Sequence, residues 1–199
     1  MGLSNLALAD LTYRNLALVG LPVLGEGARQ FGREIQKYLG LAPMDDPFIE
    51  SCQRLVPPCE AEANLRKGLP AWQLNFTSDD YVEYTWHAPT VRLYTGRPSL
   101  RAPTPGSQYP AWTRNALGGV PCVIDPMTMV AGKTIGPTLV DLLTEPAERA
   151  KAKPEFIERT GGGVGGSKWV APLLPRVFVP PIDLRWPEYV TTPHPDLAW

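Results

Sequence analysis

Proline constrains the fold of this chain more than any other residue type. The sequence holds 23 prolines in 199 residues, about twice the usual share of roughly 5%, and most of them follow residue 40. Proline fixes φ and removes a backbone donor, so regular elements cannot run through closely spaced prolines. We therefore expect long loops and extended segments, above all in residues 41–75, 101–112 and 171–199.

The length and the charge balance exclude several classes of protein. A chain of 199 residues can bury a sizeable core and fits one domain. The 19 Lys and Arg nearly balance the 20 Asp and Glu, so we expect no nucleic-acid partner and no anionic membrane surface. No stretch reaches the roughly 18 apolar residues of a membrane span, and MGLSNLALAD lacks the pattern of a signal peptide.

The three cysteines, Cys52, Cys59 and Cys122, have no disulfide or zinc-site spacing. An odd count favours a reducing compartment, so the sequence predicts a cytoplasmic protein. We expect the three side chains to be small buried apolar groups.

Hydrophobic spacing predicts two helices in the first forty residues. Apolar residues recur at three- and four-residue steps between Ser4, a plausible N-cap, and Gly20. A second helix is expected over 28–39, ending at Gly40. Both helices are one-sided and need a partner surface.

Helix signals return in the second half of the chain. Asp125 as N-cap and Pro126 at the first helical position predict a helix that runs to residue 143. A further helix is expected after Pro146, ending at the glycines 161–163. Between the two helical regions, residues 84–94 are rich in β-branched and aromatic side chains and predict a strand.

The segment GGGVGG, residues 161–166, matches the Gly-x-Gly-x-x-Gly pattern of dinucleotide-binding proteins. That mechanism needs a strand before the glycines and a helix after them. Here a helix precedes them and SKWVAPLLP follows, so the sequence favours a flexible turn or a helix stop.

The segment SDDYVEYTWHAPT, residues 78–90, gathers three carboxylates and one of the two histidines. On a helix, Asp80, Glu83 and His87 would share one face. They could then hold zinc or manganese, or Glu83 could orient the imidazole in an acid–base pair. The plain alternative is an exposed polar turn, since charge clusters are usually solvated.

Several segments resemble one enzyme family. Ser78, Asp80, Glu83, Trp86, Pro89 and Thr90 resemble the Ser-Thr-Asp-Val-Gly-Asp-Val-Ser-Trp-x-x-Pro-Thr segment of the aminobenzoyl-glutamate hydrolase branch of the zinc aminoacylase/carboxypeptidase amidohydrolases. SNLALADLTYRNLALVG, ALGGVPCVIDPMTMVAGKTIGPTLVDLLTEP and FIERTGG are similar to further segments of that family, in the same order. The resemblance covers most of residues 4–181, and it corresponds to the C-terminal part of such an enzyme.

The resemblance implies an α/β fold, namely the C-terminal part of a three-layer α/β/α zinc-peptidase-like catalytic domain with long proline-rich loops. Residues 1–199 would form a single partial domain, with 171–199 an extended tail. In this family a water bound to zinc or manganese attacks the amide bond of a small carboxylate-bearing substrate.

Reading the chain as part of an amidohydrolase gives individual residues candidate roles. Asp80 and Glu83 are the candidate catalytic residues, His87 is the candidate metal ligand, and Thr90 and Arg114 are the candidate substrate-binding residues. Two further arginines, Arg92 and Arg97, are alternatives for holding a substrate carboxylate. Surface ion pairs are the plain alternative for all three arginines.

The chain also departs from the family pattern. The early ligands, a His-x-Asp, an Asp and a Glu-Glu pair with the general base, have no counterpart, and residues 105–112 lack the last ligand histidine. Glu83 replaces an aspartate and Val82 a glycine. His87 either replaces the missing ligand or is a loop histidine.

We therefore expect part of a metal-dependent amidohydrolase, inactive alone and completed by an N-terminal subunit, with a homo-oligomer as another option. The alternatives are a non-catalytic fragment or binding protein that retains the amidohydrolase packing, and an unrelated α/β protein. A partial domain would expose apolar helix faces. The candidates for such a face are Leu6, Leu16, Phe31 and Ile35.

Overall fold

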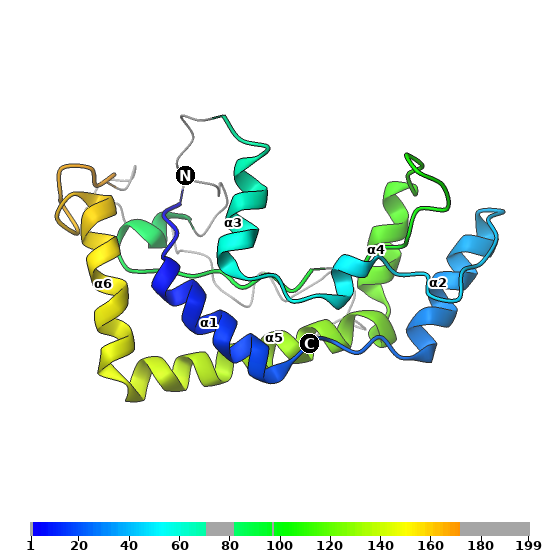
Figure 1. Ribbon diagram of the computed structural model, residues 1–199, viewed down its shortest axis with the longest axis horizontal. Coiled ribbons are helices and arrows are strands. Elements are labelled where there is room, and N and C mark those ends of the chain that lie inside the picture. Colours follow the sequence, from blue (N-terminus) through cyan, green and yellow to red (C-terminus); the bar gives the residue numbers. More distant parts are fainter. Residues whose placement is uncertain (1, 71–81, 97, 172–199) are drawn as a thin grey trace, which may run out of the picture. The chain divides into compact units, whose positions relative to one another are not determined.

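The computed structural model describes residues 2–70, 82–96 and 98–171, which are mostly helical (Figure 1). The chain divides into two units, Met1–Trp169 and Val170–Trp199, and every described helix belongs to the first. The α-helices are α1 (Leu6–Val19), α2 (Glu26–Tyr38), α3 (Pro58–Arg66), α4 (Ala111–Gly119), α5 (Pro121–Thr144) and α6 (Pro146–Thr160). The short 3-10 helices are η1 (Glu50–Gln53) and η2 (Val82–Trp86).

The prediction of an α/β three-layer fold is wrong. The described residues form no β-sheet; they hold one isolated antiparallel bridge between Phe48 and Leu100. The expected strand over 84–94 begins instead inside η2. Residues 91–96 do alternate in exposure, as an extended chain does, but no described strand pairs with them. The β-branched and aromatic composition therefore marked a segment that is extended over residues 91–96 but does not belong to a sheet.

The first, second and last helices agree with the sequence predictions. Asn5, not Ser4, caps α1, because its side chain accepts a hydrogen bond from the Leu8 N–H. The chain leaves α1 at Gly20 with φ 84° and leaves α6 at Gly161 with φ 68°. Both φ values are positive, which glycine adopts more readily than other residues, and Gly161 has the left-handed conformation that commonly ends a helix.

The helix predicted from Asp125 begins earlier. Helix α5 starts at Pro121, where a proline at the first helical position loses no hydrogen bond. Pro126 therefore lies inside the helix. Helix α4, which the sequence pattern did not predict, ends directly before α5 and packs against it.

One hydrophobic core joins α2, α4 and the start of α5. Its buried residues are Leu24, Ala28, Ile35, Phe48, Leu100, Leu117, Val123 and Met127. Gln36 is fully buried inside it. Its side-chain oxygen accepts from the Met44 N–H and its amide donates to the Tyr109 hydroxyl. The buried polar group is thus satisfied on both sides, as a buried amide must be.

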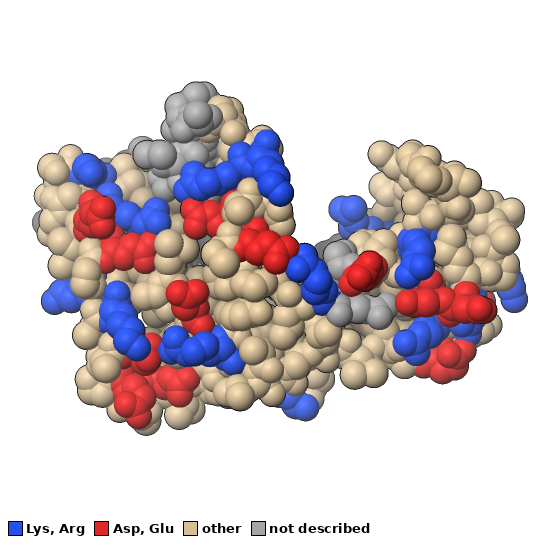
Figure 2. All heavy atoms as spheres, in the orientation of Figure 1, with Lys and Arg blue, Asp and Glu red and all other residues tan. Residues whose placement is uncertain are grey.

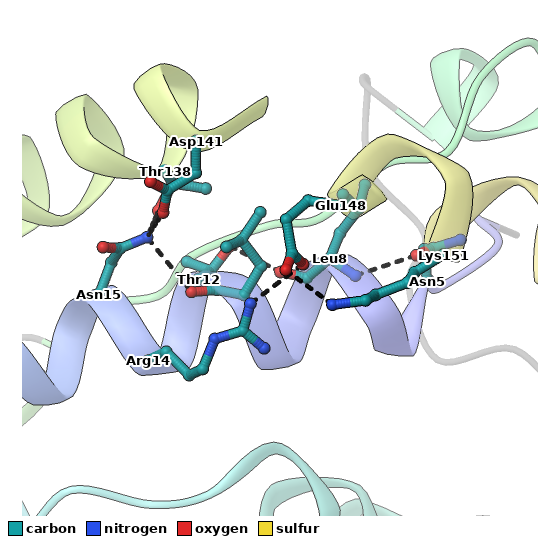
Figure 3. Close-up of polar contacts among 10 residues, drawn as sticks. Asn5, Leu8, Thr12, Arg14, Asn15, Thr138, Asp141, Glu148 and Lys151 are labelled. Carbon is teal, nitrogen blue, oxygen red and sulfur yellow. Dashed lines mark hydrogen bonds and ion pairs between the residues drawn. The ribbon is translucent and has the colours of Figure 1, made fainter. Parts of the chain in front are cut away.

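A polar seam joins α1 to α5 and α6 (Figure 3). The Asn15 amide nitrogen lies 2.8 Å from Asp141 Oδ2 and 3.3 Å from Thr138 Oγ1. Asn5 donates to the Ala152 carbonyl of α6 at 2.8 Å. At the rim, Glu148 accepts from both Arg14 and Lys151. These bonds fix which face of α1 meets its neighbours.

Surface features bear on the remaining predictions. Acidic and basic side chains are interspersed on the face in Figure 2. No helix within the described ranges combines the length and apolar character needed to cross a membrane. The three cysteines are free. Cys59 and Cys122 are exposed and Cys52 is half-buried, so the prediction of buried cysteines is wrong.

Candidate functional site

A hollow of about 380 Å³ lies among α1, α3 and the extended chain 90–94. Its described lining is mainly apolar and includes Leu6, Tyr13, Val56, Leu65, Val91 and Leu93. The hydroxyl-bearing side chains of Thr85 and Thr90 also line it. A hollow of this size with a few polar groups is typical of small-molecule sites.

The η2 turn forms one border of this hollow and is held from the N-terminal side. The backbone N–H of Leu3 donates to Thr85 Oγ1 at 2.8 Å, and both residues are buried. Thr85 Oγ1 in turn donates to the Val82 carbonyl. Because a buried hydroxyl needs partners, this pair fixes the turn against the start of α1.

The structure does not support the shared face expected for Asp80, Glu83 and His87. Asp80 lies outside the described residues. Helix η2 is a 3-10 helix with three residues per turn, which aligns Glu83 with Trp86 instead of with His87. Both Glu83 and His87 are exposed. The shared face assumed α-helical geometry, which η2 does not have over Val82–Trp86, and residues 78–81 lie outside the described residues.

No group of three or more His, Cys, Asp or Glu side chains able to hold a metal ion occurs among the described residues. The His87 ring instead packs edge to face with Trp169, with ring centroids 5.7 Å apart. The described residues alone therefore do not fit a zinc or manganese ion.

The candidate substrate-binding residues are separated by the fold. Thr90 lines the hollow, with its hydroxyl donating to the Ala88 carbonyl. Arg92 also lines it and lies over the ring of Tyr94, 4.0 Å from the centroid. Arg114 is exposed on α4 and is not among the lining residues. Arg97 lies outside the described residues.

The glycine loop, residues 161–166, is a hydrogen-bonded helix stop. Its backbone N–H groups at 161, 162, 163 and 166 all donate to oxygens of the chain itself. A phosphate-binding loop needs such donors free for the ligand. These N–H groups are therefore used to end α6, which is the helix stop that the sequence favoured.

Helix α5 presents an exposed apolar face on the side away from the core. This face, which we call the glycine face, consists of Met129, Gly132, Gly136, Leu139, Val140 and Leu143. Its four large side chains are each more than half exposed. A Cβ built on either glycine would meet no atom within 4 Å. Of the four residues predicted for an exposed apolar face, Leu6 is exposed, Leu16 and Phe31 are half-buried and Ile35 is buried.

Comparison with protein-family models, with curated proteins and with solved structures finds no match.

Proposed function

We propose that this chain supplies one wall of a metal-dependent amidohydrolase site, and that another polypeptide segment supplies the metal ligands and the general base. The sequence resemblance of residues 78–90 supports the chemistry. The observation that supports a partner is the glycine face of α5. We also propose a cytoplasmic location, since the three cysteines are free.

The glycine face has the properties of a docking surface for another backbone. Gly132 and Gly136 lie one turn apart with open space in front of them, so a second helix or strand can approach α5 closely. Around them, exposed Leu139, Val140 and Leu143 form a contiguous apolar patch. Such patches mark protein interaction sites.

The wall that the chain contributes is the segment from η2 to residue 94. Thr85 and Thr90 line the hollow, and Glu83 and His87 stand exposed on the same short segment. In this arrangement the hollow takes the apolar part of the substrate. Glu83 and His87 remain accessible to groups on the incoming segment.

A reconstitution experiment tests the proposal. The chain is mixed with a separately produced polypeptide encoded beside it that carries His-x-Asp, Asp and Glu-Glu segments, and hydrolysis of N-acylated amino acids is measured with and without zinc. We expect zinc-dependent turnover only in the mixture. Turnover by the chain alone, or failure of the two polypeptides to associate, contradicts the proposal.

A matched pair of variants tests the docking surface itself. Gly132→Leu fills the open space on the glycine face and should abolish association and turnover. Gly119→Leu adds the same side chain at another open glycine, on α4, and should leave both intact. Gly136 is a poorer choice because it precedes Pro137, and the residue before proline is itself restricted in a helix.

A binding protein without catalysis is the second candidate. The mainly apolar hollow beside α1 favours it, together with the lack of a ligand cluster among the described residues. This candidate predicts that the chain alone binds small apolar carboxylates with an affinity that zinc does not change. Zinc-dependent turnover in the mixture separates the first candidate from it.

A further inference from the structure

We propose that Trp169 is a positioning residue that holds the η2 turn and thereby sets the placement of His87. The glycine loop that ends α6 delivers Trp169 to this turn. The value of this placement for hydrolysis rests on the proposed function. The contact itself is testable without any activity.

Trp169 contacts the turn in two ways. Its indole Nε1–H donates to the Trp86 carbonyl at 2.7 Å, which ties together residues 83 positions apart in the chain. Its ring meets the His87 ring at an interplanar angle of 84°, the edge-to-face arrangement that aromatic pairs prefer. A single side chain therefore anchors the backbone of the turn and packs against the histidine ring.

The glycine loop gives Trp169 its direction. Lys168 N–H donates to the Thr160 carbonyl and Trp169 N–H to the Gly166 carbonyl, both at 3.0 Å, so the chain folds back on the end of α6. At Gly166 a Cβ would lie 2.5 Å from the Thr160 carbonyl oxygen. A residue with a Cβ would displace backbone there, so the loop in this form requires glycine.

The other end of this connection is fixed by α6. Helix α6 is bonded to the N-terminal turn of α1 through Asn5 and Ala152 and through the Leu6 N–H and Glu155. The Leu3 N–H holds η2 at Thr85 from the same region. The η2 turn is thus held by Leu3 and by Trp169. Of these two residues, Trp169 is the one whose side chain contacts the His87 ring.

Histidine NMR on the full chain tests the proposal. The chain has two histidines, so isotope-labelled imidazoles give two sets of signals, and His87→Gln identifies those of His87. Trp169→Ala should move the His87 ring signals to random-coil positions. Trp169→Phe, which keeps a ring but loses the donor, should give a smaller shift in the same direction.

Two controls make the outcome decisive. Trp112 forms a similar edge-to-face pair with Tyr38, so Trp112→Phe should leave the His87 signals unchanged. Gly166→Ala should reproduce the Trp169→Ala shift, whereas Gly119→Ala, at an open position, should not. Unchanged His87 signals in Trp169→Ala, or equal shifts in Trp112→Phe, overturn the proposal.

The readout also separates this inference from the proposed function. If the His87 signals respond to Trp169 but the mixture shows no zinc-dependent turnover, the positioning role holds and the proposed reaction fails. If turnover occurs but is unchanged in both rate and pH profile by Trp169→Phe, and the His87 signals do not move, the positioning role fails while the reaction remains.

Discussion

The side-chain amide of Asn15 donates a hydrogen bond of 2.8 Å to Oδ2 of Asp141, and this bond ties α1 to α5 (Figure 3). Asn15 is 5% exposed. Its nitrogen also lies within 3.3 Å of Thr138 Oγ1. A buried polar contact of this kind gives specificity to helix packing, because another register would take the amide away from Asp141 and Thr138.

Removing the Asn15 amide should destabilise the chain. Asn15→Ala leaves the Asp141 carboxylate short of a donor, and we expect a loss of about 1–3 kcal/mol in the free energy of unfolding, measured by urea denaturation. Gln30→Ala, at an exposed amide bonded to Glu34, should change it by less than about 0.5 kcal/mol. If both variants lower the free energy of unfolding equally, the hydrogen bond between Asn15 and Asp141 does not stabilise the fold more than a surface hydrogen bond does.

The seam also contains a titrating group. Hydrogen bonds from Lys151 and then from Arg14 lower the pKa of the Glu148 carboxyl below its ordinary value of 4.5, and partial burial opposes this shift. A lowered folded-state pKa means that the unfolded chain binds the proton more readily. The stabilisation is therefore present above about pH 4.5 and is lost as the pH falls through the folded-state value.

Glu148→Gln should accordingly be less stable than the native chain at neutral pH, and the difference should disappear as the pH falls below the folded-state pKa of Glu148. Urea denaturation across this range measures it. Because the pair with Arg14 is half-exposed, high salt should shrink the difference as well. Glu158→Gln, at an exposed position of the same helix, is the matched control variant.

Two glycines of α2 should respond to alanine in opposite ways. At Gly32 a Cβ would lie 2.8 Å from Cγ of Pro47, so Gly32→Ala should destabilise the core by about 1–3 kcal/mol through overpacking. At Gly27 the nearest atom is an ordinary contact at 3.7 Å. Gly27→Ala should stabilise α2 by about 0.5–1 kcal/mol. Thermal unfolding of both variants tests this, and a stabilising Gly32→Ala would contradict the packing described.

The helix ends were predictable because each rests on a local signal. Gly20 and Gly161 adopt positive φ at the ends of α1 and α6, and few residues other than glycine do so readily. The start of α5 was misplaced because both Pro121 and Pro126 suit a first helical position. The structure places the helix start at Pro121, and Val123, two residues later, packs in the core.

Long-range structure was not predictable from local pattern. Residues 84–94 have strand-like composition, but a strand needs a partner that composition cannot name. In the candidate site, Glu83 and His87 were grouped by assuming 3.6 residues per turn, and η2 has another geometry. Trp169 was missed because its partner is 83 residues away, and no spacing rule connects them.

The glycine face should make the isolated chain associate. Its exposed apolar side chains have no described cover, so sedimentation velocity of the native chain should show concentration-dependent association. Val140→Lys should reduce that association without lowering the free energy of unfolding, because Val140 is already exposed. A native chain that stays monomeric at all concentrations would argue against an unpartnered face.

The proposed function depends on the chain being catalytically incomplete by itself. The most direct measurement is zinc binding by equilibrium dialysis, with N-acyl amino acid hydrolysis followed on the same samples of the chain alone and of the mixture. We expect no stoichiometric zinc and no turnover for the chain alone, and both in the mixture. One tightly held zinc with turnover in the chain alone would contradict this expectation.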